Sequence, residues 1–247
     1  MTEPLYKNLP VWQQNHIKCC IDDNLFQNKK VLEVGGYTKY EITQSLNVKS
    51  WYCIDPLYRG VYIHSDAFKV FQASILDFDV NEKFDTIIAT NSFEHVNGLA
   101  AGIEHMYSLL NDGGKVSALL GPIWSCYKGH HVWYTQENGE IINFNNIKLD
   151  DWAHLLYSQE EIKEQLLKNY DEKSASDISS WIFETDFLNK MFYDDYKKLI
   201  ESSKFNIFEF RDWHKSKIPS SKIQKILEEK YNRKNFSTVS IKMLLEK

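Results

Sequence analysis

The residues best suited to acid–base chemistry are two adjacent histidines, His130 and His131. They follow an apolar segment, residues 115–120, that we expect to be a strand, so both should lie near its carboxyl end. Imidazole exchanges a proton close to neutral pH and can therefore act as a general base toward a hydroxyl group. His131 is the leading candidate and His130 the second. The alternative is a pair that only packs and hydrogen-bonds within a loop.

The same histidines belong to a group that could bind a divalent cation. Neutral imidazoles with nearby carboxylates suit such ions. A bound Mn²⁺ or Mg²⁺ would lower the pKa of a hydroxyl and so replace the general base. No fixed ligand spacing supports this site, and the base and the metal are alternative hypotheses. The candidate ligands are His130, His131, His154 and Glu94, with Asp150 and Asp151 close by in the sequence.

A second group of residues predicts a crevice for a nucleotide-like ligand. Residues 30–34 form a short apolar run typical of a buried strand, and Gly35 and Gly36 follow it directly. Glycine lets the backbone turn sharply and approach a ligand closely. Asp55 ends the next expected strand, residues 50–54, where a carboxylate can accept hydrogen bonds from both hydroxyls of a ribose. A simple Asp-Pro turn is the alternative for Asp55.

Strands and helices alternate along the first 120 residues, which predicts an α/β fold with a doubly wound, mostly parallel sheet. The last two expected strands could pair as antiparallel neighbours at the sheet edge. Glycines in the segment 111–114 indicate a turn after a helix. The expected strands are residues 30–34, 50–54, 68–75, 84–90, 115–120, 206–210 and 237–245; the expected helices are 12–26, 40–46, 99–110, 193–202 and 221–231.

Residues 121–187 interrupt this alternation. They are rich in Trp, Tyr, His and Asn and show no strong period, so we interpret them as a substrate-recognition insertion within a single domain of residues 1–247. Trp124, Trp133 and Trp152 offer flat apolar faces of the kind that line sites for sugars or nucleotide bases. Packing in a small core of the insertion is the alternative for these side chains.

Composition excludes several classes of protein. The net charge of -5 and the absence of a block of like charges argue against a dedicated nucleic-acid binder. No apolar run is long enough to span a membrane, and the first ten residues lack a leader-like pattern, so we expect a cytoplasmic protein. The four cysteines show no C-x-x-C spacing and are expected to be reduced thiols. The oligomeric state stays open, with a homodimer as one option.

Several motifs together resemble those of class I S-adenosylmethionine-dependent methyltransferases. The segment Glu33-Val34-Gly35-Gly36 resembles the first motif of that family, and Asp55 corresponds to its second-strand acid. Phe84-Asp85 with Glu94-His95-Val96 resembles a further element, and residues 110–114 match the turn before the fifth strand. The resemblance implies a Rossmann-like, seven-stranded sheet in which the last strand is inserted antiparallel.

The resemblance also implies roles for individual residues toward S-adenosylmethionine. The chain departs from the family pattern at Tyr37 and Lys39, where further glycines are usual, and at Ser74, where aspartate is frequent. The implied cofactor-binding residues are Glu33, Gly35 and Gly36 beside the methionine part, Asp55 on the ribose hydroxyls, Ser74 and Ile75 beside the adenine, and Asn91 at the methyl-donor end.

The insertion resembles bacterial methyltransferases encoded among genes for surface polysaccharides and capsules. The similar segments are residues 121–125, 129–133 and 151–155. This resemblance implies O-methylation of a small polar acceptor such as a nucleotide-activated sugar or a polysaccharide component. Methyl transfer from a sulfonium is an in-line displacement, so aligning the acceptor with the methyl group supplies most of the catalysis.

Two other classes stay open at this point. A nicotinamide-dependent sugar oxidoreductase shares the sheet and the ribose-binding acid, but its G-x-G-x-x-G pattern is missing at Gly35. A non-catalytic cofactor-binding partner of an active methyltransferase fits the loss of the later glycines. Comparing the binding of S-adenosylmethionine with that of NAD tests the oxidoreductase hypothesis. Measuring turnover by the isolated chain tests the hypothesis of a non-catalytic partner.

Overall fold

The computed structural model describes residues 4–247, so the first three residues of the amino-terminal stretch lie outside it. The chain divides into two compact units. The first unit comprises the chain up to Leu120 together with Leu199–Arg211 and Lys242–Lys247. The second unit comprises Gly121–Lys198 and Asp212–Ile241.

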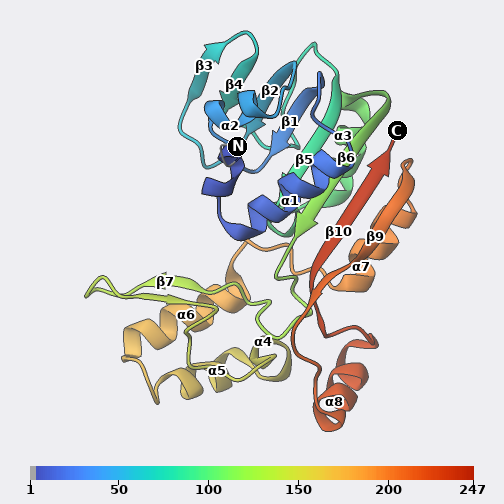
Figure 1. Ribbon diagram of the computed structural model, residues 1–247. Helices are drawn as coiled ribbons and strands as arrows, with labels where there is room; N and C mark the ends of the chain where they lie inside the picture. Colours follow the sequence, from blue (N-terminus) through green and yellow to red (C-terminus); the bar gives the residue numbers. More distant parts are fainter. Residues whose placement is uncertain (1–3) are drawn as a thin grey trace. The chain divides into compact units, whose positions relative to one another are not determined.

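The first unit contains most of an eight-stranded sheet, in the order β3-β4-β2-β1-β5-β6-β10-β9 (Figure 1), and parts of β9 and β10 belong to the second unit. β1 pairs in parallel with β2 and with β5, and β5 pairs in parallel with β6. This confirms the predicted doubly wound, mostly parallel sheet. The strands are β1 (Lys30–Val34), β2 (Ser50–Ile54), β3 (Val61–Ser65), β4 (Phe68–Phe71), β5 (Phe84–Thr90), β6 (Leu110–Leu120), β9 (Asn206–Lys215) and β10 (Thr238–Glu246).

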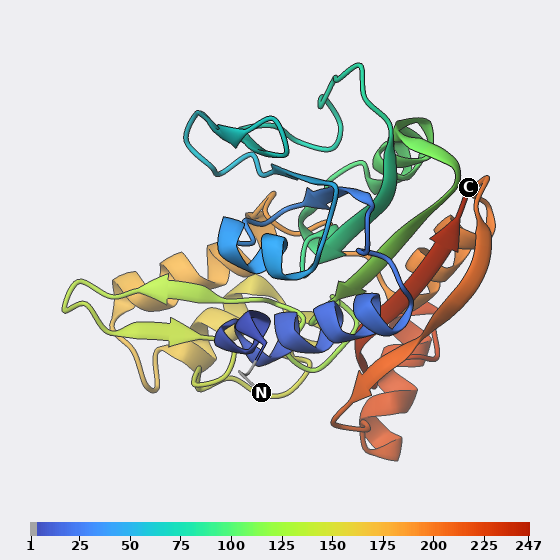
Figure 2. The ribbon, with the colours of Figure 1, turned by 45° about the horizontal axis from the view of Figure 1, so that its top comes forward.

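Apolar residues on both faces explain why the central strands are parallel and buried. Every residue of β2 is buried, as are four of the five residues of β1, as expected for strands covered by helices on both faces. α1 (Val11–Asp22) lies against one face of this sheet and α3 (Leu99–Leu109) against the other (Figures 1 and 2). The short helices η1 (Leu5–Asn8), α2 (Tyr40–Ser45) and η2 (Phe93–His95) complete this part of the chain.

The third strand differs from the prediction. The expected strand 68–75 ends at Phe71, and an additional strand, β3, forms an antiparallel hairpin with it. The sheet therefore has eight strands and not the seven implied by the family resemblance. Ser74 leaves the strand because its backbone N–H donates to Asp77 Oδ1 at 2.8 Å and its hydroxyl accepts from the Leu76 N–H at 3.2 Å. Such local side-chain bonds compete with strand pairing.

The end of the chain confirms the expected antiparallel strand. β10 lies between β6 and β9. The Lys247 N–H donates to Gly114 O at 2.9 Å, and at the opposite end of β10 the Ile123 N–H donates to Val239 O at 2.9 Å. β10 therefore runs antiparallel to β6. The expected turn at residues 111–114 is a bulge within β6, where the register with β5 shifts.

The second unit contains more regular structure than the sequence indicated. The segment 121–187 forms the hairpin of β7 (Trp133–Thr135) and β8 (Ile141–Asn143) and three helices. Ser158 and Glu161 form a capping box that starts α5, and the Asp171 side chain accepts from the Ser174 N–H to start α6. The helices of this unit are α4 (Ala153–Leu156), α5 (Gln159–Leu166), α6 (Glu172–Glu184) and α8 (Ser221–Tyr231); α7 (Tyr193–Glu201) extends across its boundary.

The helices of residues 4–247 are too short or too polar to cross a lipid bilayer.

His16 is a deeply buried ionisable side chain of α1, with 1% of its surface exposed. One ring nitrogen lies 2.6 Å from Thr90 Oγ1 on β5 and the other 2.9 Å from Ser117 Oγ on β6. Burial, followed by the charge of Lys242, lowers the pKa of His16 from 6.5 to about 3. The ring is therefore neutral in the folded protein over the whole physiological range.

The neutral state of His16 predicts a loss of stability in mild acid. Below pH 6.5 the unfolded chain binds a proton at this side chain and the folded chain does not, so the stabilisation is lost as the pH falls from 6.5 toward 3. Between about pH 7.5 and about pH 5, the free energy of unfolding of the parent protein should fall by about 2 kcal/mol more than that of His16→Gln. Urea titrations of both proteins measure this difference, and equal pH dependence would contradict it.

Candidate functional site

The carboxyl ends of three neighbouring strands form the candidate site in the first unit. β1 is followed by Gly35, β2 by Asp55 and β5 by Asn91. Because β1 pairs in parallel with both β2 and β5, these three residues lie along one edge of the sheet. Ligands of open α/β sheets bind in the crevice outside this edge.

Glu33 is the residue that organises this edge. Its side chain is buried, and its two carboxylate oxygens accept four hydrogen bonds. Oε2 accepts from the Thr38 N–H at 2.9 Å, from Trp51 Nε1–H at 2.9 Å and from the Cys53 thiol at 3.2 Å, and Oε1 accepts from the Thr38 hydroxyl at 2.8 Å. Glu33 thus joins β1 to β2 and holds the loop that follows β1.

The observed hydrogen bonds of Glu33 are made to groups of the protein itself. Both carboxylate oxygens already accept hydrogen bonds from protein groups, so the observed role of Glu33 is to shape the loop between Gly35 and Thr38. Burial, followed by the nearby Glu33 carboxylate, raises the pKa of the Cys53 thiol well above 9. Cys53 therefore keeps the proton that it donates to Glu33. A direct contact of Glu33 with the methionine part of a cofactor stays a prediction.

Gly35 is locked against the end of β5 by Ser92, a residue that the sequence reasoning missed. The buried Ser92 hydroxyl lies 2.8 Å from Gly35 O and 3.1 Å from Thr90 O, and can donate to either. Gly35 has φ = 68°, and a Cβ atom added there would lie 2.5 Å from Ser92 Oγ. A Cβ atom at Gly36 would lie 2.9 Å from Glu33 Oε1. Only glycine fits at Gly35, for both steric and conformational reasons.

Asp55 forms the turn that was one of its two alternatives, and its contact with a ribose stays a prediction. Its Oδ1 accepts from the Leu57 N–H at 2.7 Å, as in an Asp-Pro turn. Its backbone N–H donates to Phe71 O at 3.1 Å, which fixes the residue at the end of β2. The side chain is half-buried, so the carboxylate keeps access to solvent and to a ligand.

The other predicted cofactor residues lie on segments that follow neighbouring strands. Asn91 is half-buried in the left-handed region at φ = 49°, and its N–H donates to Leu119 O at 2.7 Å. Ser74 is half-buried and Ile75 is buried in the turn after β4. Glu94 is buried in η2, three residues after Asn91. The turn at Ser74 replaces the strand end expected there.

Two of the predicted histidines are buried side by side in the second unit. The rings of His130 and His154 have centroids 5.5 Å apart, and each ring is 2% exposed. His130 Nδ1 accepts from the Val132 N–H at 3.2 Å, and His154 Nε2 donates to Trp124 O at 2.8 Å. Burial lowers the pKa of His154 to about 4 and that of His130 well below 6.5. Both rings are neutral at neutral pH, and such depressed pKa values make them weak bases.

His131 differs from its neighbour in environment. It is half-buried in the left-handed region at φ = 50°, and its ring packs edge-on against Phe144 with centroids 5.6 Å apart. It therefore stays the leading candidate for a general base. The predicted metal ligands divide between the units, with Glu94 in the first and His130, His131 and His154 in the second, and the metal site stays a prediction.

The three tryptophans of the insertion occupy different environments. Trp152 is 3% exposed, donates from Nε1 to Phe236 O at 3.0 Å and packs in a core cluster with Leu155 and Leu227. This position favours the packing alternative for Trp152. Trp124 is half-buried and packs edge-on against His154, with centroids 4.6 Å apart. Trp133 is 59% exposed on β7 and is the tryptophan most accessible to a ligand.

The tight contact at Gly35 predicts a specific effect of adding a methyl group. Gly35→Ala should destabilise the protein by about 1–3 kcal/mol more than Gly60→Ala, because Gly60 also has positive φ but has open space where its Cβ would lie. Urea unfolding of the two variants measures the difference. Equal destabilisation would show that Ser92 yields freely and would contradict the described packing.

Comparisons with known proteins agree with the fold. Residues 12–166 match the family model described as a methyltransferase domain. A crystal structure of an S-adenosylmethionine-dependent methyltransferase from Mesorhizobium loti is 9% identical, covers 90% of this chain and 93% of its own, and has a TM-score of 0.52. An S-adenosylmethionine-dependent methyltransferase from Archaeoglobus fulgidus is 12% identical, covers 98% of this chain and 97% of its own, and has a TM-score of 0.50. No curated protein sequence gives a significant match. The chain belongs to the methyltransferase domain family.

Proposed function

We propose that this protein is an S-adenosylmethionine-dependent methyltransferase acting on a small polar acceptor. The observation that carries the proposal is the edge of the first unit, where the half-buried Asp55 carboxylate follows β2 and the glycine turn held by Glu33 and Ser92 follows β1. A carboxylate beside a close-approach glycine turn is the donor and acceptor set that an adenosyl ligand requires. The family membership supports the same conclusion.

The residues of the first unit have separate tasks in this proposal. Asp55 accepts hydrogen bonds from the ribose hydroxyls through the carboxylate oxygen that the Leu57 N–H leaves available. Gly35 and Gly36 let the backbone approach the methionine part, and Ile75 and Ser74 flank the adenine. When bound, the cofactor supplies a methyl group on a positively charged sulfur. The protein contributes alignment, which requires that the loops at this edge be rigid before binding.

The acceptor side of the proposal rests on the second unit. We assign substrate recognition to residues 121–187 and propose O-methylation of a nucleotide-activated sugar or another polysaccharide component. The exposed face of Trp133 suits a sugar ring or a base. His131 takes the proton of the acceptor hydroxyl, while His130 and His154, which are buried and weakly basic, support its loop. A cytoplasmic location and a homodimer are parts of the same proposal.

A divalent metal is the alternative to His131 as the means of deprotonation. Imidazoles and a carboxylate match the ligand preference of Mn²⁺. His154 donates from Nε2 to Trp124 O and keeps the Nδ1 lone pair for an ion, whereas His130 accepts from the Val132 N–H at Nδ1 and carries its proton on the other ring nitrogen. Turnover that survives excess chelator would exclude the metal, and turnover lost to chelator and restored by Mn²⁺ or Mg²⁺ would exclude His131 as the sole base.

Removing the charge of Asp55 should weaken cofactor binding. Asp55→Asn should raise the Kd for S-adenosylhomocysteine about tenfold, because hydrogen bonds to a charged acceptor are roughly twice as strong as neutral ones. Isothermal titration calorimetry measures the Kd. Asp79→Asn removes the same charge from an exposed position and should leave the Kd unchanged. NAD, titrated in parallel, should produce no binding heat. Tight binding of NAD alone would favour the oxidoreductase instead.

Substitution of His131 should separate chemistry from binding. His131→Ala should lower turnover on a panel of nucleotide sugars by about 100-fold or more, the usual contribution of a general base, with an unchanged Kd for S-adenosylhomocysteine. His214→Ala, an exposed histidine of the same unit, is the control and should retain full turnover. Full turnover by His131→Ala would remove the general-base assignment. No turnover by the parent protein on any acceptor would favour a non-catalytic partner.

A further inference from the structure

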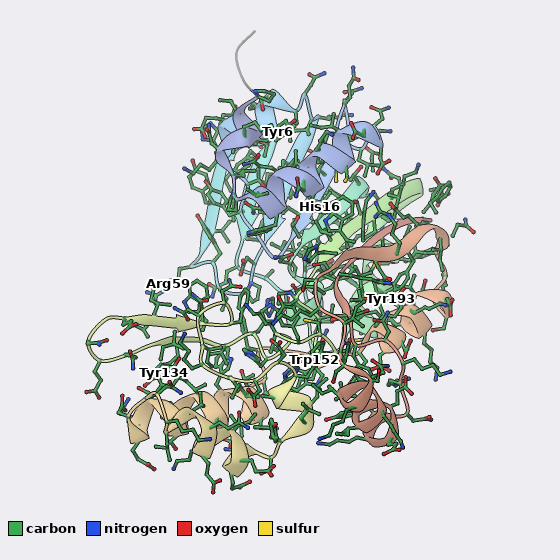
Figure 3. All side chains as sticks on the ribbon, turned by 60° about the horizontal axis from the view of Figure 1, so that its bottom comes forward. Tyr6, His16, Arg59, Tyr134, Trp152 and Tyr193 are labelled. Carbon is green, nitrogen blue, oxygen red and sulfur yellow. The ribbon has the colours of Figure 1, made fainter. Side chains whose placement is uncertain are left out.

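His16 makes a polar bridge between a helix and two strands. It lies on α1 beside the sheet of the first unit (Figure 3). Its two ring nitrogens hydrogen-bond to hydroxyls on different strands, Thr90 Oγ1 at 2.6 Å and Ser117 Oγ at 2.9 Å. The Cys20 thiol, one turn further along α1, also donates to Ser117 Oγ at 3.6 Å. A packing role alone would be served by an apolar side chain, so this set of paired polar groups calls for another explanation.

The two hydrogen bonds of His16 are directional. A neutral imidazole has one N–H donor and one nitrogen acceptor, so it donates to one hydroxyl and accepts from the other. Because each hydroxyl can donate or accept, the pair of partners satisfies either tautomer of the buried ring. In either tautomer, the Thr90 hydroxyl is held by a hydrogen bond to the ring of His16 on α1.

Thr90 connects this bridge to the candidate site. It is the last residue of β5, directly before Asn91. The Ser92 hydroxyl lies within hydrogen-bonding distance of both Thr90 O and Gly35 O, at 3.1 and 2.8 Å. The Gly35 N–H in turn donates to Ile54 O at the end of β2, at 2.8 Å. His16 is therefore connected to the glycine turn through its hydrogen bond to Thr90, the peptide segment 90–92 and the hydrogen bond from Ser92 to Gly35.

We propose that His16 is a positioning residue, which holds the end of β5 through Thr90 so that Ser92 keeps the Gly35 turn in its ligand-binding conformation. The inference rests on the proposed function, because it assigns His16 an effect on cofactor affinity. His16 touches neither the acceptor nor the cofactor in this account. Its effect is transmitted only through Thr90, and its other hydroxyl partner, Ser117, lies further back along the sheet, opposite Ile88.

The two partners of His16 provide a matched experiment. Thr90→Val keeps the shape of the side chain and removes the hydroxyl, and Ser117→Ala removes the hydroxyl at the other ring nitrogen. Both variants should lower the Tm, since each leaves one polar ring atom of His16 without its partner. Only Thr90→Val should raise the Kd for S-adenosylhomocysteine, by about five- to tenfold. Thr90→Ser restores the hydroxyl and should bring the Kd back to within about twofold of the parent value.

A second measurement does not depend on any ligand. In the ligand-free protein, Thr90→Val should speed amide hydrogen exchange in the segment Gly35–Thr38, and Ser117→Ala should not. Equal changes in both variants, or no change in either, would overturn the positioning role of His16. If the parent protein binds no S-adenosylhomocysteine, the proposed function fails, and the exchange experiment still decides whether His16 positions the glycine turn.

Discussion

The buried carboxylate of Glu33 is the constraint on which the candidate site depends. A carboxylate removed from water is costly unless its oxygens accept hydrogen bonds from the protein. Here four donors satisfy it: two from Thr38, one from Trp51 and one from Cys53. Two of these residues lie on β2 and one ends the loop after β1. The loop can take its conformation only when β1 and β2 are paired in the observed register.

Because of this requirement, the candidate site at the carboxyl ends of the strands forms only when the strands have paired. The Glu33 bonds fix the loop from the β2 side, and the Ser92 hydroxyl fixes it from the β5 side. Gly35 lies between these two supports, in a conformation and a space that exclude a larger side chain. A turn held from both sides is rigid before any ligand binds, which reduces the ordering that binding would otherwise require.

Much of the first unit followed from local sequence patterns. The strand before Gly35, the strand before Asp55 and the helix α3 were predicted well because apolar period and turn residues are local signals. The partners of Glu33 and the contact of Ser92 with Gly35 could not be predicted, since they depend on which residues the strand register brings together. Ser92 follows Asn91 in the sequence but carries no motif of its own.

In the second unit, the sequence predicted less of the structure than in the first. The sequence singled out its histidines and tryptophans for function, and the structure buries His130, His154 and Trp152. Aromatic and imidazole rings serve equally well in cores and in sites, so residue type alone does not separate these roles. The helices α5 and α6 were missed although Ser158 with Glu161 gives a local start signal, because the apolar period around them is short.

A crystal structure with bound S-adenosylhomocysteine tests the central claim most directly. The account predicts the ribose hydroxyls within hydrogen-bonding distance of Asp55 and the methionine part against the backbone of Gly35 and Gly36, with the Glu33 and Ser92 hydrogen bonds unchanged. A ligand bound away from this edge, or a glycine turn that rebuilds around the ligand and breaks the Glu33 bonds, would contradict it.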